Sequence, residues 1–224
     1  MKHREIFGEA HWLSPRSSLD AALFRSEIEI KKQIKKAEIT ICGLGWFILY
    51  INGKRVGVDE FVPAYSDYHE RSDLSLYYPL NDEWSHRIYV MKYDGAKYLH
   101  SGKNVVGIAV GGGYYHQTVR KAEGNMNYGE IKLCYKIDAD GEVFYSNRKD
   151  VTCSPGFFKK SNLYFGETLD FSGFDRKWNT VDGTLADGEE PLEVVPPKSD
   201  FFVQDCPPDR VAETLVPEFV KDFG

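Results

Sequence analysis

Apolar residues recur at every second position in residues 39–57, ITICGLGWFILYINGKRVG. On either side of a Gly-Leu-Gly break, the alternating residues are Ile39, Ile41, Phe47, Leu49 and Ile51. A period of two is typical of a strand with one face in a core. Asn52-Gly53 follows at once and favours a type I′ turn, which needs positive φ at both central residues. The segment therefore predicts a strand, with a bulge at the glycines, then a tight turn and a return strand.

Other segments repeat this pattern along the chain. Residues 24–30 and 88–93 alternate, and residues 104–110, NVVGIAV, form an apolar run suited to a strand buried on both faces. Residues 130–138 and 142–146 flank Asp140-Gly141, which predicts a second hairpin. Few stretches have a helical period. The pattern predicts an all-β fold, an antiparallel β-sandwich of jelly-roll, galactose-binding-like type with little helix.

The composition divides the chain into three parts. Residues 1–20 form a lead-in segment that Trp12 is expected to anchor, and residues 21–190 form the β-sandwich module. Beyond these, residues 191–224 form an extended connector toward a following domain. The connector is indicated by five prolines, Pro191, Pro196, Pro197, Pro207 and Pro208.

Charge and hydropathy exclude several classes of partner. The net charge is −6, so neither a nucleic acid nor an anionic membrane surface is an expected partner. No apolar run approaches the roughly 18 residues that a membrane span requires. The first 15 residues lack the apolar core of a signal peptide, and we therefore expect a cytoplasmic protein.

The four cysteines are Cys42, Cys134, Cys153 and Cys206, with no C-x-x-C pair among them. Without a signal peptide, free buried thiols are favoured over disulfides. The six histidines show no metal-ligand spacing, which argues against a zinc site.

Six segments in order resemble the N-terminal β-sandwich module of bacterial α-L-rhamnosidases, glycoside hydrolase family 78. They are FRSEIEI at 24–30, AEITICGLGWFILYINGKRVG at 37–57, VPAYSDYHER at 62–71, GKNVVGIAVGGGYY at 102–115, FGETLD at 165–170 and PPDRVAETLVP at 207–217. The chain departs from the family pattern at Gly112, Tyr114 and Leu169, and about fifteen extra residues follow Arg71. In this family an (α/α)₆ barrel supplies the catalytic acids. The resemblance therefore implies that this chain alone carries no catalytic residue.

Carboxylate pairs at Asp59–Glu60, Asp67–Glu70 and Glu167–Asp170 have the chemistry of glycoside hydrolysis, which needs an acid and a base at a fixed separation. Nothing in their spacing directs any pair toward one cleft. We therefore interpret them as solvated or capping groups. Glycines 111–113 likewise indicate a loop at a strand end and not a phosphate cradle, because no lysine or helix start follows.

Sugar binding is the more serious candidate chemistry. Pyranose rings stack on aromatic side chains, while Asp, Asn and backbone amides bind hydroxyl groups. Residues of these types in the expected loops are Tyr65, Asp67, Tyr68, Tyr114, Tyr115 and Asn127. Some modules similar to this one bind L-rhamnose with calcium, which makes calcium the one cofactor to consider. Its candidate oxygen ligands are Asp59, Glu60 and Asp67. Alternatively, these aromatic residues pack the loops and an interface with a catalytic domain.

Three functions follow from the sequence. The first is a carbohydrate-recognition module that supports hydrolysis of terminal α-L-rhamnose, with a rhamnose-containing glycan and a downstream catalytic domain as partners. The second is a purely structural module that braces the catalytic barrel. The third is a stand-alone glycan-binding protein. A concave aromatic cluster would favour recognition, and a large exposed apolar patch near the proline-rich segment would favour bracing.

Overall fold

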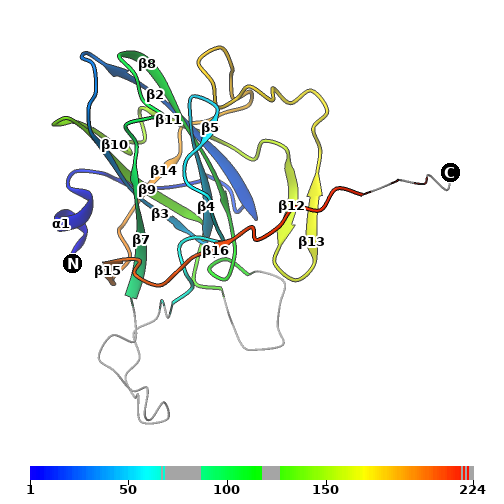
Figure 1. The fold of residues 1–224 in the computed structure, drawn as a ribbon. Coiled ribbons are helices and arrows are strands. Elements are labelled where there is room, and N and C mark those ends of the chain that lie inside the picture. The colour runs from blue at the N-terminus through cyan, green and yellow to red at the C-terminus, as the bar shows by residue number, and fades with distance from the viewer. Residues whose placement is uncertain (67, 69–86, 118–126, 218, 220, 222–224) are drawn as a thin grey trace, which may run out of the picture.

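Strands make up nearly all of the regular structure of the chain (Figure 1). The computed structural model describes residues 1–66, 68, 87–117, 127–217, 219 and 221. Asp67, Glu70 and the extra segment at 72–86 lie outside these residues. Within the described part, the one helix is α1 (His3–Phe7), and no helix there is long and apolar enough to cross a membrane.

Two sheets face each other. The larger sheet, in spatial order, contains β14 (Leu192–Val194), β1 (Trp12–Ser14), β9 (Lys132–Ala139), β3 (Ala37–Leu44), β7 (Arg87–Asp94) and β15 (Asp200–Val203), and β10 (Glu142–Tyr145) also pairs with β9. The smaller sheet contains β11 (Val151–Ser154), β2 (Ala21–Ile30), β8 (Gly102–Gly111), β4 (Trp46–Ile51) and β5 (Lys54–Arg55). The predicted all-β sandwich is confirmed. Its pairs are antiparallel except for β15, which runs parallel to β7.

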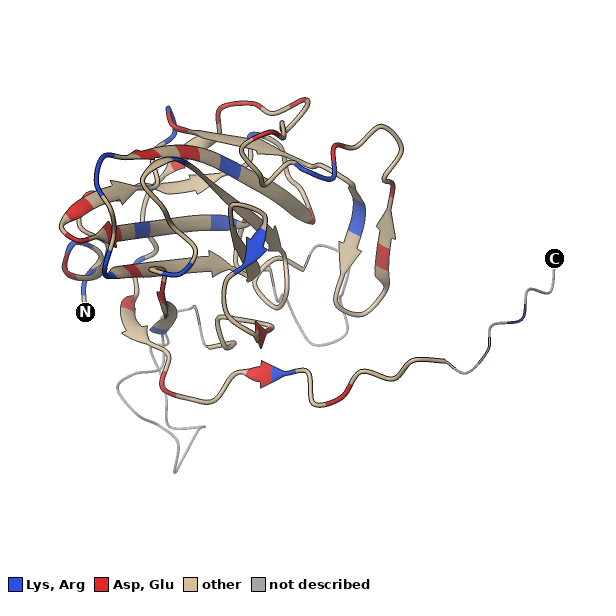
Figure 2. Ribbon diagram, turned by 45° about the horizontal axis from the view of Figure 1, so that its top comes forward, with Lys and Arg blue, Asp and Glu red and all other residues tan. Residues whose placement is uncertain are grey.

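Two short ribbons complete the fold. One is the hairpin of β12 (Phe158–Asn162) and β13 (Gly166–Leu169), which stands beside the smaller sheet (Figure 1). In the other, β16 (Asp209–Arg210) pairs with β6 (Asp59–Glu60). Lys and Arg alternate with Asp and Glu along the strands and turns and do not gather on one segment (Figure 2).

The main core lies between the two sheets. Residues 39 and 41 of β3 and residue 137 of β9 enter it from the larger sheet, and residues 47, 49 and 51 of β4 enter it from the smaller one. A second apolar cluster lies under α1 and includes Phe7, Trp12 and Phe201. Trp12 is buried, packs edge-on against Phe7 and stacks on Phe201. Residues 1–20 and 191–203 thus contribute a helix and three outer strands to the sandwich.

The prediction that residues 39–51 form one bulged strand is wrong. β3 belongs to the larger sheet and β4 to the smaller one, and the chain crosses between them at Gly45. A Cβ atom at Gly45 would collide with the carbonyl oxygen of Gly112, so the crossing requires glycine. The period of two continues across the break because both strands turn one face toward the same core. Alternation thus indicates which side faces the core but not which sheet holds the strand.

Both predicted hairpins are confirmed. Asn52 and Gly53 have φ of 51° and 78° and join β4 to β5, and Asp140 and Gly141 have φ of 50° and 85° and join β9 to β10. The strand predicted to be buried on both faces is β8, which lies between β2 and β4. Residues 104–108 and 110 are buried, whereas Ala109, on the face turned away from the core, is only half-buried, so the prediction holds for most of the strand and not for all of it.

All four cysteines are free, as predicted. Three of them are buried, but Cys206 is exposed, which corrects the expectation of four buried thiols. Cys206 follows β15 in a segment that runs outside both sheets, whereas Cys42 and Cys134 are cross-strand partners within β3 and β9.

Candidate functional site

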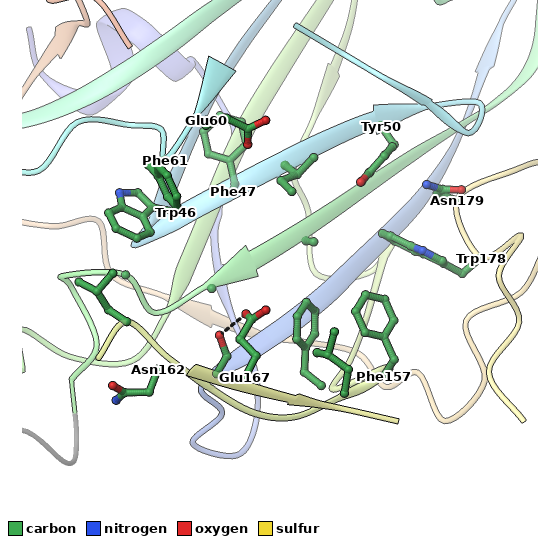
Figure 3. Close-up of a pocket in the computed structure, with 18 of the residues that line it drawn as sticks. Trp46, Phe47, Tyr50, Glu60, Phe61, Phe157, Asn162, Glu167, Trp178 and Asn179 are labelled. Carbon is green, nitrogen blue, oxygen red and sulfur yellow. Dashed lines mark hydrogen bonds between the residues drawn. The ribbon is translucent and has the colours of Figure 1, made fainter. Parts of the chain in front are cut away.

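A groove of about 660 Å³ lies on the outer face of the smaller sheet. Strands β4 and β8 form its floor, the β12–β13 hairpin forms one wall, and residues 176–179 close one end (Figure 3). We take this groove as the candidate site, because it is concave and combines aromatic with polar side chains.

The floor follows directly from the alternation of β4. Since residues 47, 49 and 51 face the core, Trp46, Ile48 and Tyr50 must face outward, and all three line the groove half-buried. The neighbouring strand β8 presents small residues on the same face, Ala109 and Gly111. Large side chains on one strand beside small ones on the next leave an open channel above β8.

Trp46 forms one end of the groove with Phe61. Their ring centroids lie 4.8 Å apart, and Phe61, with φ of 51°, is 57% exposed. Tyr114 approaches the same indole edge-on at 5.5 Å. This end therefore offers a tryptophan supported on two sides by other rings.

Tyr50 and Trp178 form the other end, with ring centroids 6.1 Å apart. A Cβ atom at Gly107 would lie 2.5 Å from the Cβ of Asn179, so the glycine allows residues 178–179 to press against the sheet. Buried Arg25 holds this segment in place. Its Nε donates to the carbonyl oxygen of Trp178 at 2.8 Å, and its Nη2 donates to the carbonyl oxygen of Gly183 at 3.1 Å.

Polar groups project from the groove walls. On the hairpin, the Ser161 hydroxyl donates to Oε1 of Glu167 at 2.8 Å (Figure 3). The Asn162 side chain also lines the wall, but its Oδ1 accepts from the backbone N–H groups of Tyr164 and Phe165 and its Nδ2 donates to Oε1 of Gln117. On the opposite side, Nη1 of Arg55 donates to Oε1 of Glu60 at 2.7 Å. This hydrogen bond lowers the pKa of the Glu60 carboxyl, which stays ionised at neutral pH.

The structure brings four of the predicted sugar-binding tyrosines together beside this groove. Tyr65 contacts Tyr114 at 5.0 Å and Tyr68 at 5.7 Å, and Tyr68 contacts Tyr115 at 5.1 Å. Tyr115 is buried, which raises its pKa to about 12, and burial also raises the pKa of the Tyr68 hydroxyl. These two rings therefore support the cluster from within, and Tyr65 and Tyr114 lie nearer its surface.

The remaining predicted residues are placed differently. Asn127 accepts a hydrogen bond from the backbone N–H of Gly129 at 3.2 Å, which shapes a turn. Asp59 accepts from Nε of Arg210, while Glu60 accepts from Arg55. Among the described residues, no three His, Cys, Asp or Glu side chains come together as metal ligands. The calcium site thus stays a prediction, and its third candidate ligand lies outside the described residues.

Comparison with known proteins identifies the family. The family model for the α-L-rhamnosidase N-terminal domain matches residues 32–78 and 75–213. The chain belongs to this family. The α-L-rhamnosidase of Formosa agariphila is 27% identical to it over 224 residues, which cover 91% of the chain and 22% of that protein. The α-L-rhamnosidase of Streptomyces avermitilis is 26% identical over 213 residues, which cover 86% of the chain and 18% of that protein.

Solved structures share the fold of this N-terminal domain. The structure of α-L-rhamnosidase from Dictyoglumus thermophilum superposes with a TM-score of 0.74 at 24% identity, covering 94% of the chain and 24% of that protein. The structure of the Streptomyces avermitilis α-L-rhamnosidase complexed with L-rhamnose superposes with a TM-score of 0.73 at 22% identity. The match covers 88% of this chain and 18% of that one. The chain therefore spans about a fifth of the length of the relatives that it matches.

Sequence analysis named Glu60 and Glu167 for other chemistry but missed most of the residues that line the groove of this N-terminal domain. They include Trp46, Tyr50, Phe61, Asn162, Trp178 and Asn179. A usable signal was present in the second face of β4, where residues 46, 48 and 50 are all large and apolar or aromatic although that face points away from the core. Such a face needs a cover or a ligand. Its cover comes from residues more than 100 positions later, which no local pattern connects to it.

Proposed function

We propose that this N-terminal domain is a non-catalytic carbohydrate-recognition module, which supports hydrolysis of terminal α-L-rhamnose by the catalytic domain of an α-L-rhamnosidase. The observation that carries the proposal is the groove beside Trp46, because it combines exposed aromatic faces with hydrogen-bonding groups. The relatives' activity, given by their names, supplies the sugar.

The chemistry of the groove matches a deoxy sugar. L-rhamnose has a methyl group in place of a hydroxymethyl, so one side of its ring is strongly apolar and stacks well on tryptophan. Its hydroxyls need donors and acceptors, which Glu167 and Asn179 supply around the aromatic floor. The groove thus provides both parts of sugar recognition.

Calorimetric titration with L-rhamnose tests this proposal. We expect binding in the millimolar range that Trp46→Ala abolishes and that Phe165→Ala, at the exposed tip of the β12–β13 hairpin, leaves unchanged. Parallel titrations with calcium and with a chelator decide whether the ion takes part. Absence of heat for the folded wild-type domain at millimolar sugar, with and without calcium, would reject the proposal.

A second function, bracing of a catalytic domain, is favoured by the segment after β16. Its apolar side chains are strongly exposed, with Val211 at 64%, Leu215 at 79% and Val216 at 84%. The segment runs away from both sheets (Figure 1). Under this alternative, backbone amides of residues 211–216 exchange fast in the isolated chain and slowly when the chain is joined to the catalytic domain. Equal exchange rates in both would rule out bracing by this segment.

A further inference from the structure

We propose that the groove binds an oligosaccharide of two or three sugar units more tightly than a single sugar, with an aromatic platform for a ring at each end. This rests on the proposed function, because it presupposes that the groove binds rhamnose-containing glycan.

The spacing of the two platforms carries the inference. Trp46 and Tyr50 lie four residues apart on the same face of β4. Because a strand rises ~3.3 Å per residue, their side chains leave the backbone ~13 Å apart. One pyranose ring is less than half that long. A single rhamnose therefore covers one platform and leaves the other empty, whereas a short chain of sugars reaches both.

The two platforms are built independently of each other. Phe61, held by the β6–β16 ribbon, supports Trp46, whereas Trp178, held by Arg25, supports Tyr50. Figure 3 shows the two pairs at opposite ends of β4. Since the supports come from different segments, each platform is fixed without the other, and two separate sugar positions result.

The floor between the platforms stays open. Ile48 on β4 pairs with Ala109 on β8, and Gly111 beside Trp46 adds no side chain. A Cβ atom at Gly111 would contact only the Ser161 hydroxyl, at 4.0 Å, so no side chain crosses the channel there. A glycan lying along β4 would direct ring faces toward the sheet and hydroxyls toward Glu167 of the hairpin wall.

The test compares L-rhamnose with a trisaccharide of α-linked L-rhamnose by titration of the wild-type domain. We expect the trisaccharide to bind about tenfold more tightly or better, because a second ring is stacked. Tyr50→Ala should remove this advantage and leave binding of L-rhamnose unchanged, whereas Trp46→Ala, which abolishes binding of L-rhamnose, should also weaken binding of the trisaccharide. Phe165→Ala is the matched aromatic control and should change neither affinity.

Ala109→Val provides a test that leaves both platforms in place. It narrows the middle of the channel with a residue suited to a strand, so it should weaken trisaccharide binding and spare L-rhamnose. Circular dichroism melting confirms that each variant is folded. Equal affinities of the wild-type domain for the two sugars would overturn the inference and leave the proposed function intact. The same holds if the Tyr50→Ala and Ala109→Val variants are folded and bind the trisaccharide as tightly as the wild type does. If neither sugar binds, both this inference and the proposed function are wrong.

Discussion

Nε of Arg210 lies 3.2 Å from Oδ1 of Asp59, which ties the C-terminal ribbon strand to a segment 151 positions earlier. Asp59 is largely buried, while Arg210 is exposed. Strand β6 leads directly into Phe61, so the segment that continues toward the exposed C-terminal residues also holds one wall of the groove. A displacement of the segment that contains Arg210 would therefore reach Trp46 through Glu60 and Phe61, the two residues that follow Asp59.

Removing the hydrogen bond between Arg210 and Asp59 should make residues 59–61 more mobile while changing the global free energy of unfolding little. Arg210→Ala is expected to lower the free energy of unfolding by less than ~1 kcal/mol, since the guanidinium is exposed. Amide hydrogen exchange at residues 59–61 should nevertheless rise, and sugar affinity should fall. Lys149→Ala, an exposed cation on another turn, is the control. Unchanged exchange at residues 59–61 would contradict the coupling.

Glu60 should make stability depend on pH in the acid range. The hydrogen bond from Arg55 lowers the pKa of Glu60 in the folded state below its ordinary 4.5. A carboxyl whose pKa falls on folding stabilises the protein above the unfolded pKa and loses that contribution as pH falls through the folded pKa. The difference in free energy of unfolding between the wild type and Glu60→Gln should be full near neutral pH and shrink below about pH 4.5.

Urea unfolding at several pH values measures this difference. Glu213→Gln in the exposed C-terminal segment is the control and should follow the wild type throughout. The assigned ion pair would be excluded if the difference in free energy of unfolding between the wild type and Glu60→Gln stayed constant down to the lowest pH at which both proteins fold.

Features set by neighbouring residues could be predicted from the sequence. The turns at residues 52–53 and 140–141 need only two residues with positive φ, and both occur where expected. The continuous apolar run of β8 likewise predicts a largely buried strand, and residues 104–108 and 110 are buried. It does not show that the outer face opens into the groove at Ala109 and Gly111.

Features set by distant contacts could not be predicted. The crossing at Gly45 depends on the approach of Gly112, and the groove depends on Trp178 and the β12–β13 hairpin folding over β4. Tyr114 was singled out for its loop position and does lie beside the groove, whereas Trp46, its neighbour, was assigned to a strand and passed over. Residue type indicated the chemistry, but only the tertiary arrangement decides which rings share a site.

Gly45 at the crossing between the sheets and Gly111 on the groove floor should respond differently to a methyl group. Gly45→Ala places Cβ against the backbone of Gly112, which has no flexible end to move, and should cost more than ~2 kcal/mol of unfolding free energy. In Gly111→Ala, the added Cβ atom makes no steric clash, since the nearest atom is the Ser161 hydroxyl at 4.0 Å. This variant should be as stable as the wild type or more stable by ~0.5 kcal/mol, because alanine restricts the unfolded chain. Thermal and urea unfolding of both variants decide this, and equal costs would contradict the crossing geometry.

Thiol reactivity should separate Cys206 from the other three cysteines. Burial raises the pKa of Cys153 to about 12 and also raises the pKa of Cys42 and Cys134, so their thiolate forms are scarce near pH 8. An aromatic disulfide reagent should label one thiol in the native protein and four in denaturant. Cys206→Ser should abolish native labelling. Rapid labelling of any thiol in that variant would show that the sandwich opens near β3, β9 or β11.

The hydroxyls of Ser26 on β2 and Tyr135 on β9 share a hydrogen bond of 2.7 Å that joins the two sheets through the core. Both side chains are buried, and burial raises the pKa of Tyr135 to about 12. Tyr135→Phe leaves the Ser26 hydroxyl unpaired and should cost ~1–3 kcal/mol of unfolding free energy, as should Ser26→Ala.

The double variant Ser26→Ala with Tyr135→Phe should cost clearly less than the two single costs together, because neither buried partner is then left unsatisfied. Tyr89→Phe on β7 controls for removal of a hydroxyl outside the core and should leave stability unchanged. Urea unfolding of the four proteins closes the cycle. Additive single costs would mean that the two hydroxyls do not interact, and the sheets would then be joined by apolar packing alone.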